Sequence, residues 1–491
     1  MSLVRGERPV DLIEDLWIGR RRLFEDKVVT GDRDRCDVFV VMRPGSGHDA
    51  TAGLHEASIL GVMSTGVDTE TFVVRGSGPI KGTVHVPGAK NSVLKLMATT
   101  LLTDGTFELT NVPDIVDVTI MGELLAALGV NMQRPAPGQL LLTNTGQITP
   151  VAPYELVEKI RASINVLGPL LTRCGEVRLS MPGGDDFGAR PIDMHISGLK
   201  AMGAEFRFTD EYLEARCERL HGADITFDFP SVGATENLLT AAVFAEGRTT
   251  IENCAREPEI TDLCNFLVAM GADVSGIGTS RLTIEGVERD ALRPVSYYTV
   301  PDRIQAATYL AATAVSNGEL NVLGIRPDDM TMLLDRFGDM GLQMSPVEID
   351  GASGLHVAAP ERMRSIDVAT LPYPGIATDY KPLIITMLSV ADGVGIVTEN
   401  LYPGRFRYVE ELQRLGADIG TTGHHAVIRG VPRLCGAEVQ AHDIRAGAAM
   451  VVAGLAAEGE TIISGVHHID RGYDDLVGRL SAVGADIRRV G

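Results

Sequence analysis

The sequence predicts an α/β protein of six similar units, each a strand–helix–strand–helix–strand segment, grouped as two domains of three units. Two recurring patterns predict this architecture. The first is a helix that ends in a small-residue turn, as in AALGV, KAMGA and QRLGA. Its glycines recur at intervals of 68 to 75 residues, at Gly129, Gly203, Gly271, Gly341, Gly416 and Gly484. Glycine supplies the left-handed residue that often follows a helix, so each copy marks a helix end and the start of a strand.

The second pattern lies upstream in each unit, where an apolar helix reaches a turn and an alternating strand follows. Its copies read LLTDGTFELTNV, LLTRCGEVRLSM, FAEGRTTIENC, VSNGELNVLGI, VADGVGIVTEN and AAEGETIISGV. Val, Ile, Leu and Thr at alternate positions predict strands with one buried face. Each unit therefore carries two helices, each followed by a strand.

Composition limits the function classes. The chain has 491 residues, of which 45% are hydrophobic, and a formal net charge of -21. Such an acidic chain is a poor match for a nucleic-acid binder, because phosphate backbones are bound by basic surfaces. No apolar run reaches the ~20 residues of a membrane helix, and Glu7 and Asp11 interrupt the place of a signal peptide's apolar region. We expect a cytoplasmic protein that binds neither nucleic acid nor membrane; the sequence carries no signal for an oligomeric state.

Residues 1–69 differ from the rest of the chain. They contain the only tryptophan, Trp17, and a stretch rich in Gly, His and Ala, and they lie outside the repeats. We interpret them as an N-terminal extension that is partly disordered. The alternative is a misassigned start codon, with Met63 as one possible true start.

Cations recur where the helices of the repeats are expected to begin. The first helix of four units has Lys90, Arg161, Arg303 or Arg445 near its first turn. A cation at that end of a helix is unfavourable by ~0.3–1 kcal/mol, because the helix dipole is positive there. The expected second helices add further arginines near their starts, among them Arg190, Arg405 and Arg471. If these helix ends face one another, they form a pocket for a ligand with several negative charges.

The stretch PGGDDFGARPIDMHISGL, residues 182–199, combines two glycines with the adjacent acids Asp185 and Asp186 and with Arg190 before a helix. A loop that carries acids and leads into an arginine at a helix start is typical of a site that handles anions. Gly-Asp loops are also common turns, so this stretch alone does not decide between the two interpretations.

Motifs for nucleotide phosphates and metals are absent from the sequence. There is no GxxxxGK[ST], no HExxH and no CxxC pair, and residues 76–82 do not fit GxGxxG. Kinase and dinucleotide-dependent chemistry are therefore not favoured, and no catalytic metal is suggested.

Ten motifs of this chain together resemble the enolpyruvyltransferase family, over residues 72–490. They are GAKNS (88–92), RASINVLGP (161–169), PGGDDFGARPIDMH (182–195), SVGATEN (231–237), AREPEI (255–260), PDRI (301–304), TD (378–379), GRFRYVEEL (404–412), DIRAG (443–447) and HIDRGY (468–473). The resemblance implies two inverted α/β domains of three repeats each. It also implies that residues 70–89 join 301–491 in one domain, while 90–300 form the other and carry the loop 182–190.

The resemblance implies an activity as well: transfer of the enolpyruvyl group of phosphoenolpyruvate to the 3-hydroxyl of UDP-N-acetylglucosamine, with release of phosphate. It implies that the reaction proceeds by addition and elimination and needs no metal or organic cofactor. This is the first committed step of peptidoglycan synthesis. Two alternatives stay open, namely enolpyruvyl transfer to another nucleotide acceptor in specialised metabolism and a non-catalytic nucleotide-sugar-binding paralogue.

Residue roles follow from the matching motifs. Lys90, Arg190, Arg405 and Arg471 would hold phosphoenolpyruvate and its adduct, with Arg161 and Arg445 supporting that charge. Asn91 would bind the sugar, and Asp379 would accept the proton of its hydroxyl. The uridine diphosphate would lie against Pro191, Ile192, Asp193, Met194, Phe229, Pro230, Ser231, Val232, Gly233 and Leu401. Two alternatives remain for single residues. Asp379 could serve only as a helix N-cap, and Arg445 could belong to a structural ion pair.

Two positions depart from the usual family pattern. Where other members often have lysine, this chain has Phe229, so a diphosphate contact there must come from the backbone. Where most members have a cysteine that acts as general acid and is alkylated by fosfomycin, this chain has Asp185, as in an aspartate-containing subgroup. A carboxylic acid can donate the proton but cannot form the stable thioether, so the resemblance implies fosfomycin resistance.

Overall fold

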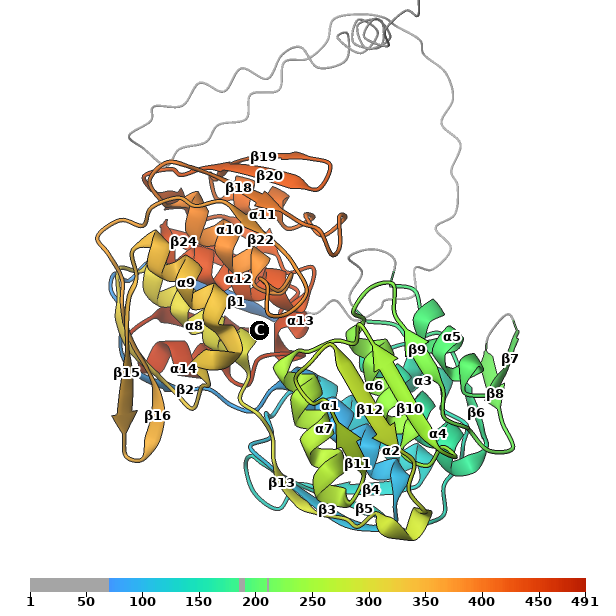
Figure 1. The fold of residues 1–491 in the computed structure, drawn as a ribbon. Coiled ribbons are helices and arrows are strands. Elements are labelled where there is room, and N and C mark those ends of the chain that lie inside the picture. The colour runs from blue at the N-terminus through green and yellow to red at the C-terminus, as the bar shows by residue number, and fades with distance from the viewer. Residues whose placement is uncertain (1–69, 185–189, 210–211) are drawn as a thin grey trace, which may run out of the picture. The chain divides into compact units, whose positions relative to one another are not determined.

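The computed structural model describes residues 70–184, 190–209 and 212–491 (Figure 1). The predicted extension 1–69 and the predicted acid Asp185, with its neighbour Asp186, lie outside the described residues. Contacts within the chain separate Met1–Thr65 from Gly66–Gly491, and the description below concerns the second of these units.

The first three repeats hold the following helices and strands, in chain order. They are α1 (Lys90–Thr99), η1 (Thr100–Leu102), β3 (Gly105–Thr110), α2 (Val116–Leu128), β4 (Val130–Gln133), β5 (Gln139–Asn144), α3 (Tyr154–Val157), η2 (Arg161–Val166), α4 (Leu167–Cys174), β6 (Glu176–Leu179), α5 (Asp193–Ala201), β7 (Glu205–Phe208), β8 (Leu213–Arg216), β9 (Asp224–Thr226), α6 (Val232–Ala242), β10 (Arg248–Glu252), α7 (Pro258–Met270), β11 (Asp273–Ser275), β12 (Arg281–Glu285), η3 (Arg289–Ala291) and β13 (Ser296–Tyr298).

The other three repeats are formed by two N-terminal strands and the C-terminal part of the chain. They are β1 (Thr71–Arg75), β2 (Lys81–His85), α8 (Arg303–Val315), β14 (Glu319–Leu323), η4 (Pro327–Met330), α9 (Thr331–Met340), β15 (Gln343–Ile349), β16 (Ala352–Ala358), β17 (Val368–Ala369), α10 (Lys381–Ser389), β18 (Val394–Thr398), α11 (Val409–Arg414), β19 (Asp418–Thr422), β20 (His425–Arg429), β21 (Leu434–Cys435), β22 (Glu438–Gln440), α12 (Ile444–Ala456), β23 (Ala457–Glu458), β24 (Glu460–Ser464), α13 (His467–Asp470), α14 (Leu476–Ala482) and β25 (Asp486–Val490).

Five four-stranded sheets share one topology. Their orders are β13-β3-β5-β4, β9-β10-β12-β11, β2-β14-β16-β15, β17-β18-β20-β19 and β22-β24-β1-β25. In each order the first pair is parallel and the next two pairs are antiparallel. The sheet β6-β8-β7 keeps the two antiparallel pairs, and its parallel neighbour is reduced to a single bridge between Val151 and Arg178. The repetition predicted from the sequence is therefore present in the hydrogen bonding of the sheets.

The repeat glycines have the predicted backbone conformation, with φ between 90° and 116° at all six positions. The predicted unit itself needs a correction. In five units the second helix is followed by a hairpin of two strands instead of one strand, as with β4 and β5. In the sixth unit β25 pairs with β1 from the other end of the described chain.

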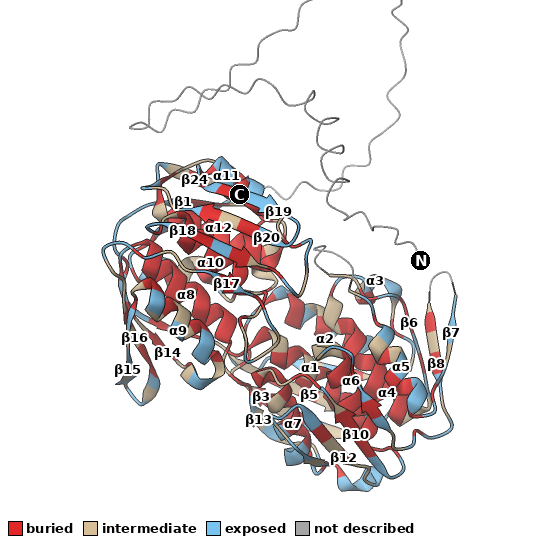
Figure 2. Ribbon diagram, turned by 45° about the horizontal axis from the view of Figure 1, so that its top comes forward, coloured by how far each residue is buried: buried red, intermediate tan, exposed pale blue. Residues whose placement is uncertain are grey.

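Buried side chains form two hydrophobic cores. The central core consists of residues between 93 and 292, and the C-terminal core of residues between 72 and 86 and between 304 and 487. In the C-terminal core the first helices of the three repeats, α8, α10 and α12, pack against one another and are buried on nearly all sides (Figure 2). The helices are buried from their first residues, so the cations near their N-terminal ends, Arg303, Lys381 and Arg445, are also removed from solvent.

The chain passes between the two cores at residues 86–89 and again at 299–302. The two passages are hydrogen-bonded to each other, since Ala89 N donates to Val300 O at 2.7 Å and Asp302 N donates to Pro87 O at 2.9 Å. A Cβ on Gly88 would lie 1.7 Å from Asn111 O, so only glycine fits there. Lys90 follows this ribbon directly, and its position is therefore well fixed.

Candidate active site

Asp117 joins two of the predicted catalytic cations. This carboxylate, in the first turn of α2, accepts a hydrogen bond from Lys90 Nζ at 2.8 Å and from Arg471 Nε at 2.8 Å. Lys90 belongs to the first repeat and Arg471 to the last, and both Lys90 and Asp117 are buried. Burial lowers the pKa of Lys90, Asp117 opposes that shift, and Arg471 and Arg445 reinforce it. The three cations therefore lie within electrostatic range of one another.

Asp379 and Arg405 form a second pair. Arg405 is 3% exposed, and its Nη1 donates to Asp379 Oδ1 at 2.8 Å and to Thr378 Oγ1 at 3.2 Å. Burial would raise the pKa of Asp379, but Arg405 and then Arg445 hold it at about 2. The first residue of α10 is Lys381, and the helix has no side-chain cap. Asp379 is therefore an ionised carboxylate bound to arginine and does not act as an N-cap.

A buried ion pair fixes the segment that carries Arg405. Lys381 Nζ lies 2.9 Å from Glu399 Oε2 and donates to Arg405 O at 2.5 Å. The remaining acceptor capacity of Glu399 is used by two threonine hydroxyls, Thr370 and Thr378, and by the amides of Leu401 and Tyr402. A charged pair in a dry interior is tolerable only with such complete hydrogen bonding, so this segment is held rigidly.

Arg445 lies on the second position of α12 and is 4% exposed. Its guanidinium carbon lies 5.5 Å from the centre of the Tyr473 ring, and its Nη1 has no hydrogen-bond partner among the described residues. No carboxylate of the described residues forms an ion pair with Arg445, although Tyr473, Asp379 and Asp302 raise its pKa. The structural-ion-pair alternative therefore stays open. A buried guanidinium nitrogen without an acceptor is costly, so Arg445 Nη1 is a candidate donor to an anionic ligand.

Arg161 holds the two described ends of the predicted catalytic loop. Its guanidinium donates to Pro182 O at 3.3 Å and, in a short contact, to Arg190 O. Burial, and then the charge of Arg190, lowers the pKa of Arg161 to about 10. Gly184, with φ of 104°, leaves room for this contact, since a Cβ there would lie 3.0 Å from Arg161 N.

Tyr402 connects the loop ends with the Asp379 pair. Burial raises the pKa of its phenol, Asp379 adds to that shift, and Arg190, Arg405 and Arg161 oppose it. The structure thus brings Arg161 and Arg190 of the second repeat close to Arg405 and Asp379 of the fifth.

The residues predicted for the nucleotide sugar lie around two helix starts. Ser231 caps α6, its side chain accepting from Ala234 N at 3.3 Å, and Val232 and Gly233 form the first turn. Phe229 is 44% exposed, whereas Ile192, the residue before α5, is buried. The other predicted residues are half-buried or exposed, namely Asn91, Pro191, Asp193, Met194, Pro230 and Leu401.

Sequence reasoning missed Asp117, Glu399 and Tyr402. An acid in the first turn of a helix is favoured by the helix dipole anyway, so Asp117 looked like an ordinary residue. Its partner Arg471 is 354 positions away in the sequence. Glu399 and Tyr402 act through contacts that arise only when the chain folds.

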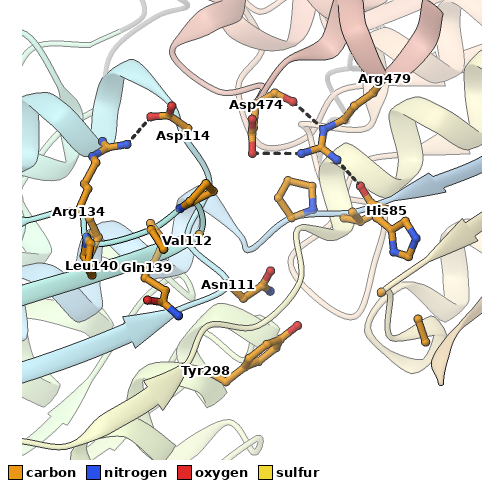
Figure 3. A pocket seen from close by; sticks show the side chains of 18 residues that line it. His85, Asn111, Val112, Asp114, Arg134, Gln139, Leu140, Tyr298, Asp474 and Arg479 are labelled. Carbon is orange, nitrogen blue, oxygen red and sulfur yellow. Dashed lines mark hydrogen bonds and ion pairs between the residues drawn. The ribbon is translucent and has the colours of Figure 1, made fainter. Parts of the chain in front are cut away.

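A separate cavity of about 840 Å³ lies beside the passages between the cores (Figure 3). Its walls include Asn111, Gln139 and Tyr298 from one side and His85 and Arg479 from the other. None of its lining residues is a predicted site residue, and its two arginines are already paired, Arg134 with Asp114 and Arg479 with Asp474. This cavity is therefore distinct from the group of predicted site residues.

No helix among the described residues is both long and apolar enough to cross a bilayer. Within 70–184, 190–209 and 212–491, no group of three or more His, Cys, Asp or Glu side chains is placed to hold a metal ion. The absence of a cofactor stays a prediction.

Comparison with known proteins gives consistent matches. The model of the EPSP synthase (3-phosphoshikimate 1-carboxyvinyltransferase) family matches residues 74–480. The UDP-N-acetylglucosamine 1-carboxyvinyltransferase of Nocardia farcinica is 48% identical over 428 residues, covering 86% of this chain and 99% of the relative. The protein of that name from Mycobacterium tuberculosis is 47% identical over 422 residues, with the same coverage.

Solved structures show the same fold at lower identity. The enolpyruvyl transferase NikO from Streptomyces tendae superposes with a TM-score of 0.77 at 24% identity, covering 86% of this chain and 99% of that one. An EPSP synthase from Acinetobacter baumannii gives a TM-score of 0.67 at 19% identity, covering 86% of this chain and 100% of that one.

Proposed function

The chain belongs to the EPSP synthase family of carboxyvinyltransferases, and on that basis we propose that it transfers the enolpyruvyl group of phosphoenolpyruvate to the 3-hydroxyl of UDP-N-acetylglucosamine. Relatives named for this activity are 47–48% identical and are covered almost entirely. The reaction releases phosphate and is the first committed step of peptidoglycan synthesis.

One observation carries the proposal: buried cations from several repeats gather near two carboxylates, Asp117 and Asp379. Lys90, Arg405 and Arg445 are each less than a tenth exposed; Lys90 is paired with Asp117, and Arg405 and Arg445 lower the pKa of Asp379. Phosphoenolpyruvate has a carboxylate and a phosphate, which matches an excess of positive charge. Its anions would also supply acceptors for Arg445 Nη1, which has none among the described residues.

The site residues are assigned as follows. Lys90, Arg190, Arg405 and Arg471 bind the carboxylate and phosphate of phosphoenolpyruvate, and Arg161 and Arg445 add charge. Asn91 binds the sugar. The uridine diphosphate lies on the starts of α5 and α6, contacting Pro191, Ile192, Asp193, Met194, Phe229, Pro230, Ser231, Val232, Gly233 and Leu401.

The addition step needs one base and one acid. Asp379 accepts the proton of the 3-hydroxyl as that oxygen attacks C2 of phosphoenolpyruvate, and Asp185 gives a proton to C3. In the elimination step the Asp185 carboxylate left by the addition takes a proton from C3 as the bond from C2 to the phosphate oxygen breaks, which gives the enol ether and free phosphate. Arg405 holds the pKa of Asp379 at about 2 in the free protein, which makes the carboxylate a weak base. Substrate anions that draw Arg405 away would raise this pKa and so activate the base.

The test is coupled phosphate release with a panel of acceptors. We expect turnover with UDP-N-acetylglucosamine and phosphoenolpyruvate, and little with nucleosides that lack the sugar. Turnover with another nucleotide alone would support the specialised-metabolism alternative, and tight binding of the UDP-sugar without turnover would support a non-catalytic paralogue. The names of the relatives favour neither alternative.

The role of Asp185 is tested with fosfomycin. Wild type should keep its activity during incubation with the epoxide, because a carboxylate forms no stable thioether. The Asp185→Cys variant should be inactivated in a time-dependent manner, and Asp185→Ala should lose nearly all turnover. Rapid inactivation of wild type, or full activity of Asp185→Ala, would contradict the assignment.

Two further points belong to the proposal. We assign residues 70–89 with 301–491 to one domain and 90–300 to the other, which agrees with the composition of the two hydrophobic cores. The cytoplasmic location predicted from the sequence is kept as part of the proposed function.

A further inference from the structure

Arg303 bridges the two cores through a buried bidentate ion pair. This residue begins α8 in the C-terminal core, and Glu259 lies in the first turn of α7 in the central core. Arg303 Nε donates to Glu259 Oε1 at 3.0 Å and Nη2 donates to Oε2 at 3.2 Å. The exposed fractions are 8% for Arg303 and 5% for Glu259, so the pair is removed from solvent.

The third guanidinium nitrogen of Arg303 reaches the neighbour of the proposed base. Arg303 Nη1 donates to Tyr380 Oη at 3.0 Å, and Tyr380 follows Asp379 directly. Tyr380 is 2% exposed, so its ring has no freedom to follow a displaced partner. The ring of Tyr373 lies 5.6 Å from the Arg303 guanidinium carbon, and Arg256, just before α7, donates to Tyr373 O at 3.3 Å.

Stability alone is a weak reason for such a pair. The free-energy cost of desolvating two buried charges offsets most of their attraction. Replacing such a pair by apolar residues therefore often leaves the stability of the protein unchanged or raises it. A bidentate guanidinium–carboxylate contact does fix direction, because both groups are planar. Here it fixes the direction of Nη1 and therefore the position of the Tyr380 hydroxyl.

We propose that Glu259, Arg303 and Tyr380 act as positioning residues that align the Asp379 carboxylate for the proposed enolpyruvyl transfer. The inference rests on the proposed function. None of the three residues touches the substrate in this scheme. Glu259 sets the orientation of Arg303, Arg303 holds the Tyr380 hydroxyl, and Tyr380 fixes the backbone at Asp379. A base must lie within about 2.6–3.2 Å of its proton, and a 1 Å displacement can cost about 100-fold in rate.

The sharpest variant is Tyr380→Phe, which removes one hydroxyl and leaves the Arg303–Glu259 pair intact. We expect kcat to fall about 10-fold while KM for both substrates stays within about twofold. The matched control is Tyr309→Phe on α8, since Tyr309 is fully buried and its hydroxyl has no hydrogen-bond partner among the described residues. This control should keep wild-type kcat.

A second variant, Glu259→Gln, tests whether the residues act as one unit. It keeps the side-chain volume and removes the charge, and we again expect a loss of kcat of about 10-fold. The double variant Tyr380→Phe/Glu259→Gln should lose about 10-fold and not about 100-fold, because both changes break the same chain of contacts.

Distinct results separate this inference from the proposed function. A wild type without turnover would refute the proposed function. An active wild type whose Tyr380→Phe variant has full kcat would refute the positioning role alone. A Tyr380→Phe variant with unchanged kcat and a raised KM for phosphoenolpyruvate would also refute it, because that pattern indicates a role in ligand binding.

Discussion

Arg303 and Arg445 occupy similar places in two repeats and have opposite environments. Each lies at the start of a fully enclosed helix behind an aspartate N-cap, Asp302 or Asp443, that accepts hydrogen bonds from two backbone amides. Arg303 uses all its nitrogens on protein acceptors. Arg445 has a buried nitrogen with no acceptor in the described part of the chain. The repeat therefore places an arginine at the same end of two helices, and Glu259 opposite Arg303 is what commits that arginine to a protein partner.

The largest expected effect concerns Arg445. In Arg445→Gln we expect kcat/KM for phosphoenolpyruvate to fall by about 10³-fold, roughly 4 kcal/mol, because charge in a water-excluded site is lost. The melting temperature should fall only modestly, since the contact of Arg445 with Tyr473 and its attraction to Asp379 and Asp302 are lost while a buried nitrogen without an acceptor is also removed. Steady-state kinetics and thermal unfolding measure the two effects. A large loss of stability with unchanged kinetics would show that Arg445 resembles Arg303 after all.

The next effect concerns Arg303. Replacing it by Met leaves the Glu259 carboxylate buried without its partner, so we expect the free energy of unfolding to fall by roughly 3 kcal/mol. The double variant Arg303→Met/Glu259→Leu should regain most of that loss. Urea unfolding of both variants provides the measurement. If the single variant is as stable as wild type, the pair does not have the buried character described above.

A smaller effect concerns pH. Asp379 acts as a base only when ionised, so activity is lost as the pH falls through its pKa of about 2. Above about pH 4, which is two units above this pKa, Asp379 is fully ionised, and its titration should not limit kcat/KM of wild type. Arg445 lowers this pKa, so in Arg445→Gln the acid limb should move to higher pH. The low pKa would be contradicted if kcat/KM of wild type fell on the acid side near pH 6 and if the Asp379→Glu variant shifted that fall.

The smallest effect concerns the N-caps. Asp443→Ala removes an acceptor for Arg445 N and Ala446 N and should cost about 1 kcal/mol of stability. Serine also caps helices, so Asp443→Ser should stay within about 0.5 kcal/mol of wild type. Chemical denaturation measures both. Equal losses in the two variants would mean that the charge of Asp443, 3.8 Å from Arg405, matters more than its cap.

The repeat pattern could be predicted because the residue after each of these helices needs a backbone conformation that favours glycine. All six repeat glycines have positive φ, which other residues rarely adopt, and so they mark helix ends in the sequence. The extra hairpin strands could not be predicted in the same way. β11 has three residues and β4 has four, too few to show an alternating pattern of their own.

The candidate site was only partly predictable. Lys90, Arg405 and Arg445 lie at recognisable helix starts or motifs; the structure brings the charges of Arg405 and Arg445 close to Asp379, and that of Lys90 to Asp117. The acids that orient these cations could not be found, because Asp117 and Arg471 meet only in the folded chain. Arg303 looked like a ligand-binding cation, and only its contact with Glu259 shows otherwise.

The pairing of β1 with β24 and β25 has a consequence for biosynthesis. Thr71 lies opposite Val490, so the first strand of this sheet waits for the last to be translated. At roughly 5–20 residues per second this interval is on the order of 20–80 s, during which β1 exposes apolar side chains. Residues 90–300 can bury their own core on the ribosome in that time. A nascent chain that lost only Asp486–Val490 would therefore leave β1 with an open edge, and chaperone dependence should concentrate on this last stage of synthesis.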